Sequence, residues 1–269
     1  MKTFIHHFMF EFRSGVRNKQ LLLMNYLFPL GFYLLMGFIM PSINPPFLET
    51  LVPALVVFSV LASTLLGIPD PLVNARENGI FRSFKINGVP SISVLSIPAL
   101  TTTLHLALVT AVITITAPLF FKAPLPVNWI NFVIVFLAIT FSSACISVLI
   151  GVVSPSSRMT VLWSQIIFVP SMLLGGLMLP YNMLPEIAGK AARLLPASHA
   201  MNAFNSLAMG KAADFSPWGS VIVLILSGVL AFLLAIFLFS WDNRNTKRRG
   251  NTLLAILVLL PFVISIFLK

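Results

Sequence analysis

Seven long stretches of this chain contain no charged residue, and this feature limits what the chain can fold into more than any other. A helix needs about 20 apolar residues to cross a hydrocarbon core of about 30 Å, and each stretch is close to that length. The seven predicted spans cover residues 21–40, 51–68, 94–121, 129–153, 159–184, 218–241 and 252–268. We therefore predict an all-α integral membrane protein with six transmembrane helices and a candidate seventh hydrophobic helix on the C-terminal side.

The composition indicates that lipid is the surrounding solvent. Of the 269 residues, 58% are hydrophobic and 9% are charged, and the mean hydropathy is +0.99, whereas soluble domains carry about a quarter charged residues. The net charge of +10 would suggest nucleic-acid binding on a soluble protein, but the basic residues lie between the apolar stretches. We therefore expect the lipid bilayer and no nucleic acid as a partner. The single cysteine, Cys145, excludes a disulfide framework within the chain.

Lys and Arg are concentrated on one side of the predicted topology. Four, three, one and four basic residues fall in the N-terminal segment and in the loops after the second, fourth and sixth helices, twelve of the 17 in total. Basic residues are retained in cytoplasmic loops, so we expect a multi-pass protein of the cell (plasma) membrane with a cytoplasmic N-terminus. We expect no signal peptide, because the first apolar run has span length and no small-residue cleavage site follows it.

Proline and glycine interrupt several of the predicted spans. Pro98 and Pro118 predict a kink or a break in the third helix. The fifth helix is expected to be split, and the residues that would split it are Pro170, Gly175, Gly176 and Pro180. Pro261 lies in the middle of the last stretch, which either crosses the membrane or returns as a hairpin.

Residues 1–20 are predicted to form an amphipathic helix that lies in the cytoplasmic interface. Their apolar residues recur at helical spacing, and these are Phe4, Ile5, Phe8, Met9, Phe12 and Val16. The alternative is a simple extension that orients the first span. The neighbouring His6 and His7 do not favour a metal site, since adjacent residues point about 100° apart on a helix.

Several functional classes lack their signature residues. Gly189-Lys190 and Gly210-Lys211 are each followed by alanine, so the chain has no phosphate-binding loop of its own. The seven spans contain no Asp, Glu, Lys or Arg, which disfavours ion coupling. We expect a non-catalytic subunit without a metal or a cofactor, in which His105 is satisfied by a neighbouring helix.

Polar residues in the fourth span are expected to make small-residue contacts between helices. They are Thr140, Ser142, Ser143, Cys145 and Ser147. The alternative is a polar wall of a translocation path.

The first of two informative segments is the predicted cytoplasmic loop at residues 70–90. Charged and apolar residues alternate in it, and these are Arg76, Glu77, Arg82 and Lys85 with Ile80, Phe81, Phe84 and Ile86. An ordinary loop needs no such apolar face, so we expect this amphipathic piece, which ends at Gly88 and Pro90, to dock on a partner protein.

The second informative segment follows the break in the fifth helix. Gly175, Gly176 and Pro180 break the helix before it leaves the membrane, and Pro185 and Pro196 follow. Residues 186–214 are too apolar for a free loop, so we expect short re-entrant helices on the extracytoplasmic side.

In this order, the two segments resemble the membrane (permease) subunit of type-2 ABC exporters. The resemblance covers residues 1–245, and residues 246–269 are an extra C-terminal hydrophobic segment. In that family, a loop with Arg76-Glu77-Asn78-Gly79 and Pro90 carries the coupling helix, and a glycine-rich fifth span precedes the re-entrant helices. The resemblance implies coupling residues Arg76, Glu77, Gly79, Phe81, Arg82, Phe84 and Lys85, and a re-entrant gate of Gly175, Gly176, Pro180, Pro185 and Pro196.

The resemblance also implies the partners. A separate ABC ATPase subunit would hold ATP and Mg²⁺, and a second permease subunit would complete the path for a drug, peptide or lipid-like substrate leaving the cytoplasm. The main alternative is a stand-alone channel or facilitator, which needs no docking face. A membrane-embedded transferase or protease would need clustered carboxylates or a Ser/His pair inside the spans, and we find neither in the sequence.

Overall fold

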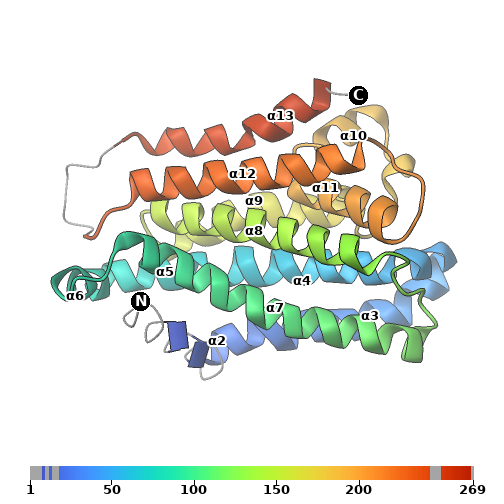
Figure 1. Cartoon of the computed structure of the whole chain (residues 1–269), viewed down its shortest axis with the longest axis horizontal. Helices are drawn as coiled ribbons and strands as arrows, with labels where there is room; N and C mark the ends of the chain where they lie inside the picture. The colour runs from blue at the N-terminus through green and yellow to red at the C-terminus, as the bar shows by residue number, and fades with distance from the viewer. Residues whose placement is uncertain (1–7, 10–11, 14–17, 243–249, 268–269) are drawn as a thin grey trace.

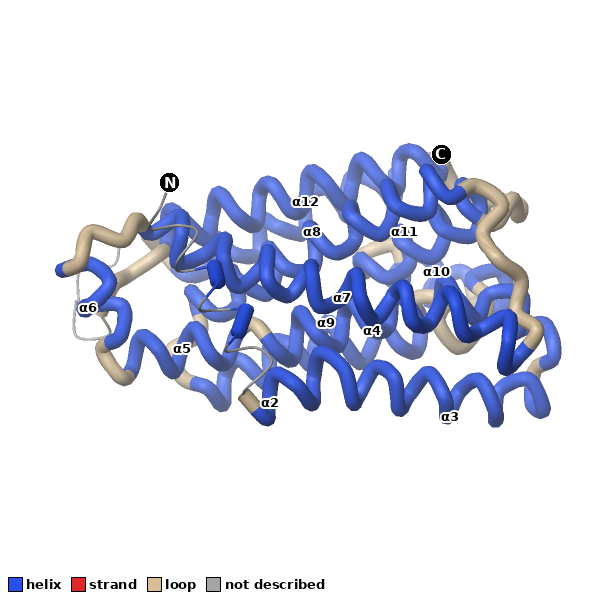
Figure 2. Tube along the Cα trace, turned by 60° about the horizontal axis from the view of Figure 1, so that its bottom comes forward, coloured by secondary structure: helices blue, strands red, loops and turns tan. Residues whose placement is uncertain are grey.

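The computed structural model describes residues 8–9, 12–13, 18–242 and 250–267. The described residues form helices and loops without a strand, and most of the helices run lengthwise in one bundle (Figures 1 and 2). The all-α fold with six helices long and apolar enough to cross a membrane is thereby confirmed. The interfacial helix predicted for residues 1–20 lies mostly outside the described residues and stays a prediction, as do His6 and His7.

The helices of the first half are α2 (Lys19–Leu22), the π-helix η1 (Leu23–Leu27), α3 (Phe28–Ile43), the 3-10 helix η2 (Pro45–Thr50), α4 (Leu51–Gly67), α5 (Pro69–Glu77), α6 (Ile80–Ile86), α7 (Ser91–Phe121) and α8 (Trp129–Val153). The second half has α9 (Ser157–Leu174), the 3-10 helix η3 (Tyr181–Met183), α10 (Glu186–Ala192), α11 (Pro196–Ala203), the π-helix η4 (Phe204–Ala208), α12 (Pro217–Leu238), the 3-10 helix η5 (Thr252–Leu259) and α13 (Leu260–Phe267). Helix α6 lies at one end of the bundle and α10 at the other (Figure 1). We refer to these as the α6 end and the α10 end.

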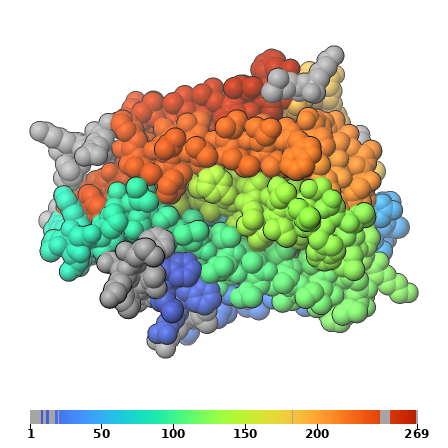
Figure 3. Space-filling view, in the orientation of Figure 1, coloured from blue at the N-terminus to red at the C-terminus, as the bar shows by residue number. Residues whose placement is uncertain are grey.

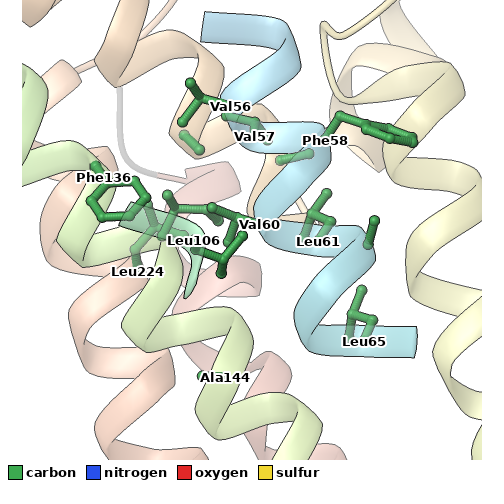
Figure 4. Packing of buried hydrophobic residues seen from close by; sticks show 14 of the residues in the cluster. Val56, Val57, Phe58, Val60, Leu61, Leu65, Leu106, Phe136, Ala144 and Leu224 are labelled. Carbon is green, nitrogen blue, oxygen red and sulfur yellow. The ribbon is translucent and has the colours of Figure 1, made fainter. Parts of the chain in front are cut away.

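Helix α4 forms the centre of the bundle. Every residue from Leu51 to Leu65 is buried, because α3, α7, α8, α9 and α11 all pack against this helix. Val60 lies beside Leu106 from α7 (Figure 4), and Phe58 stacks on Phe32 with ring centroids 3.8 Å apart. A helix that is apolar on all sides is expected in such a position.

Helices α8 and α12 pack closely through small residues. A Cβ atom on Gly228 would lie 2.6 Å from Cε1 of Phe141 and 3.1 Å from Cα of Ser142. All five polar residues that the sequence analysis singled out in this span are buried, namely Thr140, Ser142, Ser143, Cys145 and Ser147. Their burial favours a role in packing over a polar wall.

The structure confirms one predicted break in the spans and corrects others. Helix α9 ends at Leu174, because the chain leaves the helix at Gly175, and Gly176 has a φ of +84°, so the fifth span breaks at the predicted glycines. Pro170 lies within α9, and Pro98 and Pro118 lie within the continuous helix α7, so these prolines break neither helix. The first span likewise continues past Pro41 to Ile43.

The C-terminal segment runs back along α12 from the α6 end to the α10 end (Figure 1). It is a 3-10 helix of 8 residues followed by an α-helix of 8 residues. With a rise of about 2.0 Å per residue in 3-10 and 1.5 Å in α geometry, these residues extend about 28 Å. Pro261 is the second residue of α13, so the change from 3-10 to α geometry occurs directly before it. Whether this segment crosses the membrane stays a prediction, since it is shorter than the six helices that are long and apolar enough to span.

Candidate functional site

The predicted coupling segment consists of two short helices joined by a glycine. Helix α5 follows α4 directly and ends at Glu77, and Gly79, with a φ of +73°, turns the chain into α6. Glycine suits this turn because the left-handed region is costly for residues with a Cβ. Gly88, with a φ of +70°, follows the end of α6. The segment forms one end of the molecule and projects beyond α12 (Figure 3).

Arg76, a predicted coupling residue, points into the protein. The residue is 5% exposed, and its guanidinium donates hydrogen bonds to the carbonyl oxygens of Val152, at 2.8 Å, and of Ser154. These carbonyls belong to the last turn and the C-cap of α8, where a cation interacts favourably with the helix dipole. In this chain, Arg76 therefore fastens α5 to the end of α8.

The aromatic residues of α6 also face inward. Phe81 is buried and contacts Phe239 at 5.5 Å between ring centroids, while the partly buried Phe84 packs on the same core. Arg82 forms an exposed ion pair with Asp242, which follows α12. These contacts hold α6 against the residues that follow α12.

Four charged or apolar residues of α5 and α6 have exposed side chains that are available to an external partner. Glu77, Ile80, Lys85 and Ile86 are all exposed, with Ile80 at 44% and Ile86 at 79%. We call these four residues the α6 surface. Of the seven predicted coupling residues, only Glu77 and Lys85 belong to it, while Arg82 lies beside it in its ion pair and Gly79 sets its position.

The predicted gate residues lie together at the α10 end. A Cβ atom on Gly175 would lie 2.5 Å from Cβ of Ala197, so α9 and α11 approach closely there. Pro180 and Pro185 directly precede η3 and α10, and Pro196 is the first residue of α11. Residues 186–208 form short helices, and α11 is buried along its whole length, while their re-entrant, extracytoplasmic position stays a prediction.

A cavity of about 300 Å³ opens beside these residues. Its wall is formed by η2 and the residue before it, by the segment that follows α9, by α11 and η4, and by the loop before α12. The lining includes Phe47, Glu49, Gly175, Gly176, Leu177, Met178, Tyr181, Ser198, Met201, Asn202, Asn205, Lys211, Ala212 and Asp214. We call it the α10-end cavity.

Sequence reasoning missed the residues that fix this end of the bundle. Arg193 donates to the carbonyl oxygens of Ser265 and Ile266 in α13 and lies 4.8 Å from the ring centroid of Phe215. His199 bonds through Nε2 to the carbonyl of Arg193 at 2.9 Å. Burial lowers the pKa of His199 to about 4. The contacts of Arg193 with α13 and with Phe215 join residues far apart in the chain, so no local sequence pattern predicts them.

The histidine in the third span has the neighbour that the sequence analysis expected. The hydroxyl of Tyr26 lies 2.6 Å from Nδ1 of His105. The ring of Phe12 stacks on the His105 ring, with 4.6 Å between the ring centroids. Among the described residues, no three His, Cys, Asp or Glu side chains lie close enough to hold a metal ion.

Comparison with protein families identifies the chain. The family model described as ABC-2 type transporter matches residues 4–209, which include the α6 surface and most of the α10 end. No curated protein and no solved structure matches the chain. In this family, the membrane component is non-catalytic and the ATPase is a separate subunit. The chain therefore belongs to the ABC-2 type transporter family, as a membrane permease subunit of an ABC transporter.

Proposed function

We propose that this permease forms a transport path with a second permease subunit and exports a hydrophobic or amphipathic substrate from the cytoplasm. A separate ATPase subunit holds ATP and Mg²⁺ and docks on the α6 surface. The observation that carries this proposal is the exposure of Ile80 and Ile86 on a helix whose aromatic side is already packed against the bundle. Exposed isoleucines between charged residues suit a protein partner.

The firm attachment of α6 supports a role in force transmission. Arg76 links α5 to the end of α8, and Arg82 links α6 to the residue Asp242 beyond α12. A push on the α6 surface is thereby passed to α8 and α12, which pack closely together. A loop that merely connects two spans needs neither link.

The charge distribution supports a cytoplasmic location for the α6 end. The loops predicted at this side carry most of the Lys and Arg residues, as expected for cytoplasmic loops. We infer a cytoplasmic N-terminus, an extracytoplasmic α10 end and residence in the plasma membrane. In this orientation, Gly175, Gly176, Pro180, Pro185 and Pro196 form the outer gate of the path.

A pull-down experiment tests the proposal against the alternative of a stand-alone channel. The tagged chain is purified in mild detergent from its native membranes, and the proteins that come with it are identified by mass spectrometry. We expect an ATPase with a phosphate-binding loop in stoichiometric amount.

Ile86→Asp should remove most of the ATPase, because a buried charge without a partner opposes docking. Ile187→Asp is the matched control, since Ile187 is 85% exposed on α10 at the opposite end. Both substitutions affect exposed side chains, so the folded permease should persist in each, and this is checked by gel filtration. Purification without an ATPase even after cross-linking would favour the channel.

A further inference from the structure

The α10-end cavity has two polar groups that find no partner within the protein. Ser198 is 3% exposed and lines the cavity, and its Oγ has no hydrogen-bond partner. The Oδ1 atom of Asn205, which also lines the cavity, is buried and equally without a partner. Buried polar groups are normally paired, because an unmade hydrogen bond costs stability.

The side-chain amide of the neighbouring Asn202, in contrast, is fully hydrogen-bonded within the protein. Its Nδ2 donates to the carbonyl of Phe215 at 2.9 Å and to Oγ of Ser220 at 3.0 Å. Its Oδ1 accepts from the backbone N–H of Asp214 at 2.9 Å. Asn202 thus fixes the loop that carries Asp214 to the cavity.

The floor of the cavity is apolar and leads toward the interior of the bundle. Phe47, Leu177 and Met178 line the cavity and also line a smaller cavity of about 10 Å³. The smaller cavity is entirely apolar and reaches Phe58 in the centre of the bundle. A molecule that fills this site must therefore have an apolar body as well as a polar group.

The charged residues around the cavity leave an excess of negative charge. Among its described lining residues, Glu49 and Asp214 are acidic and Lys211 is basic. Lys211 and Glu49 form an ion pair of 2.9 Å between Nζ and Oε2. Among these lining residues, the carboxylate of Asp214 remains as the net charge, which favours a cationic ligand over an anionic one. Arg193 lies nearby, at 4.8 Å from the ring of Phe215, but it does not line the cavity and donates to carbonyl oxygens of α13.

We propose that the α10-end cavity binds an amphipathic organic cation, with the charge near Asp214 and Glu49 and the apolar body against Phe47, Tyr181 and Met201. As a substrate site, the cavity rests on the proposed transport function, whereas binding itself needs only this chain. A volume of about 300 Å³ lies at the lower end of the range for small-molecule sites. The ligand is therefore a compact cation and not a long lipid.

Two ions of the same shape and opposite charge test this proposal. The full chain, without an ATPase, is placed in phosphatidylcholine nanodiscs, and the binding of radiolabelled tetraphenylphosphonium is measured. We expect saturable binding that unlabelled tetraphenylphosphonium displaces and tetraphenylborate does not. Nanodiscs without protein give the background from partition into lipid.

Substitutions with opposite expected effects separate binding from misfolding. Asp214→Asn should weaken binding of the cation about fivefold, and Lys211→Gln should strengthen it by about the same factor. A gain in affinity cannot result from damage to the fold. Glu186→Gln is the control, because Glu186 forms a similar ion pair, of 2.7 Å with Lys190, but does not line the cavity.

The outcomes decide the two proposals separately. Absence of saturable binding, equal displacement by tetraphenylborate, or an unchanged affinity in Lys211→Gln would overturn the inference about the cavity. If an ATPase still docks on the α6 surface, the proposed function survives that failure. Binding of the cation by a chain that captures no ATPase would instead support the cavity and contradict ATP-driven transport.

Discussion

Arg76 and Arg82 belong to the same charged segment, but the protein surrounds them differently. Arg76 is buried and bonded to two backbone carbonyls of α8, while the side chain of Arg82 is 55% exposed in its ion pair with Asp242. A motif read from the sequence treats both as surface charges. Burial instead makes Arg76 a residue that maintains the fold, and leaves docking to its neighbours.

We predict that Arg76→Gln lowers the stability of the folded protein by about 2 kcal/mol, since charge-assisted hydrogen bonds to buried carbonyls are lost. Arg82→Gln should cost about 0.5 kcal/mol, as is typical of exposed ion pairs. The midpoint of thermal unfolding, followed by gel filtration of heated samples, measures both effects. Equal losses in the two variants would show that burial of Arg76 does not matter.

His199 predicts a pH dependence at the α10 end. Its pKa is lowered to about 4 by burial, below the value of about 6.5 of an exposed histidine. The unfolded chain therefore binds a proton more readily, and the stability that is present above about pH 6.5 is lost as the pH falls toward 4. Between pH 7.5 and 5.5 the loss from this group should be about 1 kcal/mol.

Thermal unfolding at these two pH values tests the effect of His199. The unfolding midpoint of the unsubstituted protein should fall on acidification, and His199→Gln should have a smaller fall. An equally large fall in the variant would assign the pH dependence to other groups.

At the scale of elements, the contact between α9 and α11 depends on one glycine. A side chain at Gly175 would meet Cβ of Ala197 at 2.5 Å and the carbonyl of Ser171 at 2.2 Å. We predict that Gly175→Ala destabilises the protein by about 2 kcal/mol, within the range for overpacking. Gly31→Ala is the matched control, because nothing lies within 4 Å of its added Cβ. The thermal midpoints of the two variants measure the difference, and a neutral Gly175→Ala would contradict the close approach.

The C-terminal segment yields a prediction about topology. Its 3-10 and α-helical halves run along α12, and Arg193 holds the last turn of α13 at the α10 end. Single cysteines are introduced by Asn251→Cys and Phe267→Cys in a background with Cys145→Ala. A membrane-impermeant maleimide added to intact cells should label position 267 and not position 251. Labelling of neither position before the membrane is permeabilised would indicate a hairpin that returns to the cytoplasm.

At the scale of the whole molecule, charge-free stretches of span length were sufficient to predict the six main helices. Helix α8 has the predicted bounds, because its length and polarity are local properties. The break of the fifth span at Gly175 agrees with the prediction from its glycines, whereas the close approach of α11 at this position could not be predicted from local sequence. Likewise, the inward direction of Phe81 depends on Phe239 from a distant part of the chain. Alternation of charge and apolar residues predicted a docking helix but not which of its sides is free.

The central claim is that an ATPase touches the α6 surface. The most direct measurement places a photo-crosslinking amino acid at position 86, and in a second variant at position 187, in the protein in its native membrane. After irradiation, we predict a covalent adduct between position 86 and an ATPase with a phosphate-binding loop, and none from position 187. An ATPase adduct from position 187 alone, or no ATPase adduct from position 86 while the ATPase still co-purifies, would contradict docking at this surface.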